Sequence, residues 1–165
     1  MLKNGLLSVF LFSFISLPAM ADPEHARQLG AQARAMLEKI ETARANADQA
    51  AILAAPNFSS HLKRDLQAFG LGAARLSTEI KDLGGPKDFQ CIFRGMAEET
   101  GVQLKAIATA HTGYEQSDAL TRLHSMLEDA DAVSEAARLT MLKKQSSNLT
   151  HATSDIIGSC QRAER

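Results

Sequence analysis

The stretch FSSHLKRDLQAFGLGAARLSTEIKDLGGPKDFQCIFRGMAEETGVQLKAIATAH, residues 58–111, decides the fold. Its apolar residues form two series spaced mainly by three or four positions, which is the spacing of one face of an α-helix. Between the series, Gly84-Gly85-Pro86 combines a glycine suited to a left-handed helix cap with a proline that prevents continuation. The stretch therefore predicts two helices joined by a tight turn. The first series is Phe58, Leu62, Leu66, Phe69, Ala73, Leu76, Ile80 and Leu83, and the second is Phe89, Ile92, Phe93, Met96, Leu104 and Ile107.

The segment before this stretch predicts another long helix. Asp22 is suited to cap it, Pro23 suits the first helical position, and Ala55-Pro56-Asn57 ends it. Its apolar seam alternates steps of three and four residues, as in a coiled coil, and its second half is purely alanine. The seam is Ala26, Leu29, Ala33, Met36, Ile40, Ala43, Ala47, Ala50 and Ala54.

After residue 111, Thr112-Gly113-Tyr114-Glu115 has the spacing of a capping box and predicts a further helix. The apolar seam of this helix is Leu120, Leu123, Leu127, Ala130, Ala137 and Met141. Beyond Met141 the apolar residues shift by about 100° around the helix, so we expect a break at residues 145–148 and a short fifth helix. The sequence thus predicts an all-α fold, an antiparallel helical bundle of four long helices plus a short C-terminal helix.

The first 21 residues have the pattern of a cleaved signal peptide. Lys3 gives the positive start, residues 6–17 are an uncharged apolar run, and Ala19-Met20-Ala21 is a small-x-small cleavage site. The apolar run is shorter than the roughly 20 residues of a permanent membrane helix. We expect cleavage after Ala21, export to the periplasm or beyond without a permanent membrane anchor, and a single helical domain over residues 22–165.

Composition excludes some classes of partner. The chain has 18 Lys+Arg and 19 Asp+Glu, for a net charge of -1, and the charges are interspersed without a basic cluster. Nucleic-acid binding needs a clustered basic face, so we expect no nucleic-acid partner.

The two cysteines, Cys91 and Cys160, predict one disulfide, because a cysteine pair in an exported chain usually forms a bridge. A chain reversal at residues 145–148 brings them level, whereas one straight helix leaves them some 35 Å apart. Two free thiols, an intermolecular bridge and half of a metal site are the alternatives.

Metal and haem binding have no specific motif. His124 and Glu128 have the i, i+4 spacing of a helical zinc site, and we interpret them as a surface pair. Residues 156–163 resemble the C-terminal helix of cytochrome c′-type bundles, but Ala163 and Glu164 replace the cysteine and histidine that attach haem covalently. We therefore expect no metal and no covalent cofactor. The histidines considered are His25, His61, His111, His124 and His151.

No arrangement of catalytic residues stands out, so we expect a protein that is not an enzyme. The preferred hypothesis is an adaptor, chaperone-like or inhibitor module that contacts another exported or envelope protein. The alternative is a small-ligand binder that holds haem, metal or a lipid-like molecule in the bundle core. The alanine half of the first seam is a possible interaction surface, although close packing within the chain is the favoured interpretation. These residues are Ala43, Ala47, Ala50 and Ala54.

Overall fold

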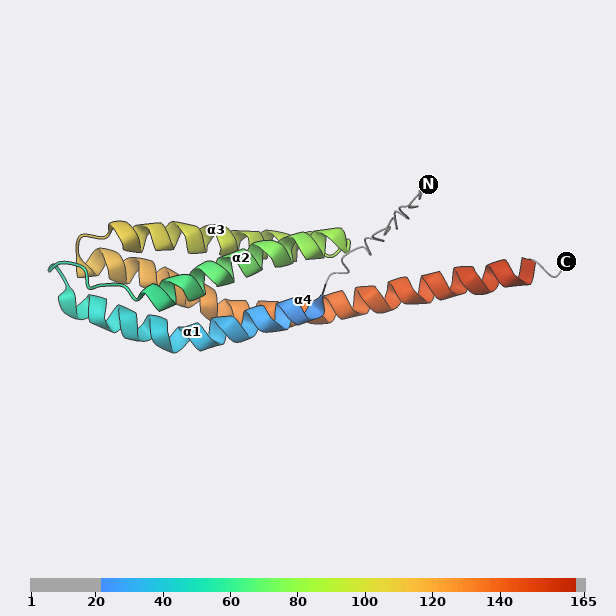
Figure 1. The fold of residues 1–165 in the computed structure, drawn as a ribbon, viewed down its shortest axis with the longest axis horizontal. Helices are drawn as coiled ribbons and strands as arrows, with labels where there is room; N and C mark the ends of the chain where they lie inside the picture. The colour runs from blue at the N-terminus through green and yellow to red at the C-terminus, as the bar shows by residue number, and fades with distance from the viewer. Residues whose placement is uncertain (1–21, 163–165) are drawn as a thin grey trace, which may run out of the picture.

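Four antiparallel helices make up the described part of the chain in a computed structural model (Figure 1). The structure describes residues 22–162, and the side chains of residues 22–147. The prediction of an all-helical fold is confirmed. The helices are α1 (Pro23–Ala50), α2 (Ser60–Asp82), α3 (Lys87–Thr109) and α4 (Gly113–Arg162).

One apolar core is shared by all four helices. It is built from the residues that the helical spacing marks, with Phe69 of α2 and Phe93 of α3 among the largest fully buried side chains. α1 packs mainly against α4, and α2 mainly against α3. Burying these side chains is the main favourable contribution to the stability of such a fold, at roughly 25 cal/mol per Å² of apolar surface.

Local chemistry sets most helix ends, and those at Asp22 and Gly84 are as predicted. The Asp22 carboxylate accepts a hydrogen bond from the Glu24 N–H at 2.9 Å, and the Ser59 hydroxyl accepts from Leu62 N–H at 3.4 Å. Gly84 has a φ of 67°, in the left-handed region, at the end of α2. Such caps satisfy backbone groups that a helix end otherwise leaves without partners.

The capping box before α4 is also present. The Thr112 hydroxyl accepts from Glu115 N–H at 3.3 Å, while the Glu115 carboxylate accepts from His111 N–H at 2.7 Å. The carboxylate thus satisfies a backbone donor one residue earlier than in the standard motif.

The structure differs from the sequence prediction at the ends of two helices. α1 ends at Ala50 rather than Ala54, because residues 51–55 pair with the α3–α4 connection instead. The predicted fifth helix is absent, since α4 continues unbroken to Arg162 and extends past the other helices (Figure 1). Ser146 and Ser147 donate their hydroxyl hydrogen bonds to carbonyls four residues earlier, which accommodates them inside a helix.

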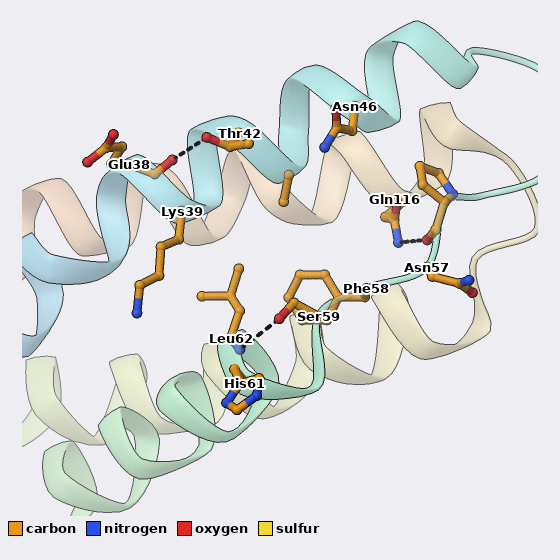
Figure 2. A pocket seen from close by; sticks show the side chains of 12 residues that line it. Glu38, Lys39, Thr42, Asn46, Asn57, Phe58, Ser59, His61, Leu62 and Gln116 are labelled. Atoms are coloured by element: carbon orange, nitrogen blue, oxygen red, sulfur yellow. Dashed lines mark hydrogen bonds between the residues drawn. The ribbon is translucent and has the colours of Figure 1, made fainter.

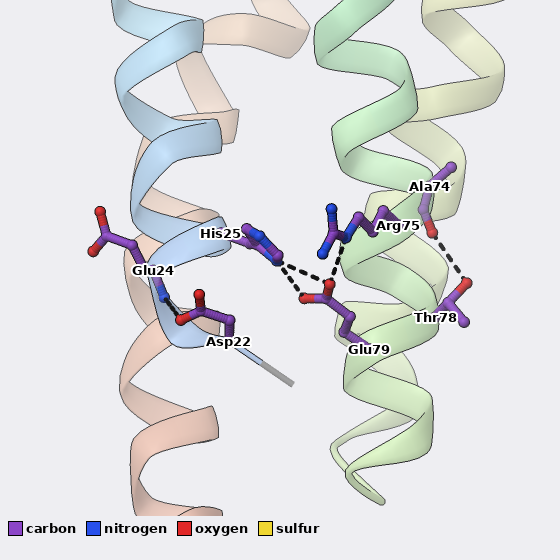
Figure 3. Close-up of polar contacts among 7 residues, drawn as sticks. All are labelled: Asp22, Glu24, His25, Ala74, Arg75, Thr78 and Glu79. Atoms are coloured by element: carbon purple, nitrogen blue, oxygen red, sulfur yellow. Dashed lines mark hydrogen bonds and ion pairs between the residues drawn. The ribbon is translucent and has the colours of Figure 1, made fainter. Parts of the chain in front are cut away.

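A polar cluster joins the start of α1 to the end of α2 (Figure 3). The half-buried Glu79 carboxylate lies 2.9 and 3.0 Å from His25 Nδ1 and accepts from Arg75 Nε at 2.8 Å. The cluster fixes the spacing between α1 and α2 at one end of the molecule. At the opposite end, residues 51–59 connect the two helices.

Candidate functional site

Two loops meet at one end of the molecule, the α1–α2 loop (residues 51–59) and the α3–α4 loop (residues 110–112), here called the paired loops (Figure 1). Ala54 and Thr112 form an isolated antiparallel bridge. Ala55 N–H donates to His111 O at 3.2 Å, and Gly113 N–H donates to Leu53 O at 3.1 Å. These backbone hydrogen bonds fix the relative position of two connections far apart in the sequence.

The α4 start continues the same pairing. Tyr114 N–H donates to Ala51 O at 2.9 Å, and the buried Gln116 amide donates to Pro56 O at 2.9 Å. Together with the hydrogen bond from Gly113 N–H to Leu53 O, these contacts hold the first turn of α4 against residues 51–56.

Three large apolar side chains of this end are exposed to solvent, and we call them the apolar tip. Ile52 is 77% exposed, Leu53 is 68% exposed and Tyr114 is 56% exposed. Scattered exposed apolar residues need no explanation, but a group on adjacent, mutually bonded backbone is typical of an interaction site. The apolar tip is therefore the leading candidate for a functional surface.

Backbone strain and close packing both occur directly beneath the apolar tip. Ala51 has φ 50° and ψ -113°, a conformation that residues with a side chain rarely adopt. Gly113 lies so close to α1 that an added Cβ would stand 2.2 Å from Ala47 O. Such strain persists only where the surrounding structure holds the backbone in place. The paired loops therefore have a defined backbone conformation.

A groove of about 600 Å³ lies beside the paired loops, between α1 and the start of α2 (Figure 2). Phe58 and Leu62 form apolar parts of its lining, and Lys39, which donates to Asp65 at 2.9 Å, lies along one side. A volume in this range accommodates a small organic ligand. The remaining lining residues are Glu38, Thr42, Ala43, Asn46, Pro56, Asn57, Ser59, His61 and Gln116.

The four alanines of the possible interaction surface do not form one exposed face. Ala47 is fully buried, Ala43 and Ala50 are half-buried, and Ala54 is exposed within the paired loops. The close approach of Gly113 to Ala47 and Ala50 places α4 directly against this seam. The small alanine side chains thus leave room for the backbone of another helix of the same chain.

The two cysteines are not brought together by the continuous α4. Cys91 is exposed on α3 with a free thiol, and the side chain of Cys160 lies outside the described residues. Thr100 of α3 contacts Met126 of α4, so Cys91 lies level with about residue 135, roughly 37 Å along the helix axis from Cys160. The disulfide stays a prediction, and it requires α4 to bend.

The histidines are dispersed over the molecule. His25 belongs to the cluster with Glu79, His61 lines the groove, and His111 lies in the paired loops. His124 lies 3.3 Å from Glu128 and 3.6 Å from Glu41, as the predicted surface pair and a contact to α1. Within residues 22–147, no group of three or more potential metal ligands converges. The side chain of His151 lies outside the described residues.

Charged side chains of both signs lie near the apolar tip. Residues 48–55 and 109–118 contain Asp48, Glu115 and Asp118 but no lysine or arginine. Arg44, one turn before Asp48, is engaged by Glu41, whose carboxylate accepts two hydrogen bonds at 2.7 and 2.9 Å. These hydrogen bonds from Arg44 lower the pKa of Glu41 below its usual range. Arg44 also interacts electrostatically with Asp48, and Arg122 follows Asp118 by one helical turn, so cations lie close to these carboxylates.

No local pattern in the sequence predicts the apolar tip. Ile52 and Leu53 lie off the alanine seam of α1 and belong to no predicted apolar face. Two large apolar residues in succession, directly before Ala54-Ala55-Pro56, are the signal that could have marked them. Tyr114 was considered only as part of the capping box. The proximity of these residues depends on the pairing of the two loops, which no local pattern encodes.

Comparison with known proteins adds no relationship. No protein-family model matches the sequence, and neither a curated protein nor a solved structure is significantly similar to it. Among the described helices, none has a stretch long and apolar enough to cross a membrane.

Proposed function

We propose that the chain is an exported, non-enzymatic protein that acts by contacting another exported or envelope protein, as an adaptor, chaperone-like or inhibitor module. The signal-peptide pattern of residues 1–21 supports export, with cleavage after Ala21 and one mature domain over residues 22–165. The proposed contact surface is the apolar tip, which lies on the α1–α2 loop and the first turn of α4.

The observation that carries this proposal is the exposure of Ile52, Leu53 and Tyr114 on a backbone held by hydrogen bonds. Leaving such side chains in water forgoes stabilisation that burial would supply, about 1.5–3 kcal/mol for a large apolar residue. A fixed loop conformation also lowers the entropy lost on binding. Both features are typical of the central part of a protein–protein interface.

Site-specific photo-crosslinking tests the proposal. Leu53 is replaced by p-benzoylphenylalanine in the full chain, expressed in its own host, and the adducts formed on irradiation are identified by mass spectrometry. Leu71 provides the matched control, because it is 74% exposed on α2, away from the paired loops. We expect one defined protein adduct from position 53 and none from position 71. No adduct at 53, or the same adducts at both positions, would refute the proposal.

A second candidate function is the binding of a small molecule, such as haem, a metal ion or a lipid-like compound. The groove lined by Phe58 and Leu62 favours it, since it offers apolar surface next to amide groups. An absorption band, stoichiometric metal or co-purified lipid in the purified protein would support this function over the first.

A further inference from the structure

We propose that the groove between α1 and the start of α2 binds an uncharged organic molecule that has an apolar face and a hydrogen-bond donor. This site is separate from the apolar tip. The inference rests on the second candidate function, and it adds the chemical class of the ligand. It follows from the side chains that line the groove (Figure 2).

Gln116 of α4 supplies a hydrogen-bond acceptor in the lining of the groove. This residue is only 3% exposed, and its amide nitrogen donates to Pro56 O at 2.9 Å. Because only the nitrogen can donate to a carbonyl, the orientation of the amide is fixed and Oε1 remains as an acceptor. Within residues 22–147, Oε1 accepts no hydrogen bond. A buried amide oxygen without a donor is unfavourable, so a ligand that donates to it gains affinity.

Apolar side chains line the same groove as this acceptor. Phe58 and Ala43 are half-buried, and Leu62 lies next to them in the wall of the groove. A volume of about 600 Å³ accommodates a ring compound packed against these side chains. A ligand with one apolar face and one polar edge therefore matches the lining.

The charged side chains of the groove are paired within the chain or directed away from its apolar wall. Lys39 donates to Asp65 at 2.9 Å. Arg64 donates to His61 Nδ1 at 2.7 Å, so this imidazole is neutral and carries its proton on Nε2. Figure 2 shows the Glu38 carboxylate directed away from the apolar wall. A carboxylate ligand would place its oxygens against the amide oxygen acceptor, whereas an uncharged N–H or O–H group complements it.

NMR titration of the full exported protein with benzamide and with benzoate tests the inference. The two probes have nearly the same shape, but only benzamide is uncharged and carries N–H donors. We expect saturable shifts of the Asn46, Phe58 and Leu62 resonances with benzamide, at millimolar concentrations because the probe is small. Benzoate should bind at least about tenfold more weakly, since it cannot donate to the amide oxygen.

Two variants locate the binding. Gln116→Leu removes the acceptor and should abolish the preference for benzamide, but it also removes the donor to Pro56 O. Asn46→Phe is therefore the second variant, because Asn46 is exposed and a bulky side chain there blocks the groove without disturbing the core. Gln49→Phe is the matched control, since Gln49 is exposed on the same helix outside the groove. We expect Asn46→Phe to prevent binding and Gln49→Phe to leave it unchanged.

Equal or tighter binding of benzoate would overturn the inference. So would the absence of saturable shifts with benzamide, shifts confined to residues outside the groove, or unchanged binding to Asn46→Phe. None of these outcomes alters the crosslinking result at position 53, so the protein-contact function is tested separately.

Discussion

Replacing Gly113 with alanine tests the close packing that supports the paired loops. The added Cβ would lie 2.2 Å from Ala47 O and 2.8 Å from both Ala50 Cβ and Ala51 N. An ordinary van der Waals contact of a Cβ begins at 3.4 Å. Two of the three atoms belong to the backbone and cannot rotate away, so the start of α4 must move from the end of α1.

The expected cost is about 1–3 kcal/mol of unfolding free energy, the range measured for overpacked sites. Moving α4 also strains the hydrogen bond from Gly113 N–H to Leu53 O, which holds the apolar tip in place. Alanine is the better helix former, so helix propensity acts in the opposite direction, by at most about 1 kcal/mol. Steric overlap is the larger effect, and Gly113→Ala is expected to destabilise the protein.

Urea unfolding followed by circular dichroism measures this effect, with Gly101→Ala as the matched control. An added Cβ at Gly101 meets nothing within 4 Å, in the interior of α3. There the same substitution is expected to stabilise the protein by about 0.5–1 kcal/mol. If Gly113→Ala is as stable as the parent or more so, the close approach of α4 to α1 is refuted.

Three further predictions concern backbone strain, export and the cysteines. Ala51→Gly is expected to raise the unfolding free energy by about 1 kcal/mol, because the strain relieved at φ 50° exceeds the additional chain entropy that glycine loses on folding; a lower urea midpoint would contradict this. The intact mass of protein recovered from the periplasm should correspond to a chain that starts at Asp22, and a soluble chain that retains residues 1–21 would refute cleavage. The Cys91–Cys160 disulfide should leave no free thiol under denaturing, non-reducing conditions, whereas labelling of both thiols would agree with the continuous α4.

Local sequence chemistry was sufficient to predict where most helices begin and end. Asp22, Ser59 and Gly84 each act on backbone groups within a few residues, so their effect can be read without tertiary structure. The apolar series were equally informative, because a side chain's place on a helix face depends only on its position in the sequence. These features predicted an all-helical fold with one shared apolar core.

The ends of α1 and α4 and the apolar tip depended on information that local patterns do not contain. Residues 51–54 continue the helical spacing of α1, but pairing with residues 111–113 overrides it. The shift of the apolar face after Met141 suggested a break, yet no glycine or proline enforces one between Met141 and Ser147. The apolar tip arises where two loops separated by more than 50 residues meet, so only the folded chain brings its members together.

The most direct test of the central claim is the affinity of the crosslinked partner for the double variant Ile52→Ser/Leu53→Ser, measured by isothermal titration calorimetry. Because both side chains are mostly exposed, their replacement should change the unfolding free energy by no more than about 0.5 kcal/mol each. We expect binding to weaken at least about tenfold while the melting temperature stays nearly constant, and Leu71→Ser to change neither. Unchanged affinity of the double variant would contradict the claim that the apolar tip is the contact surface.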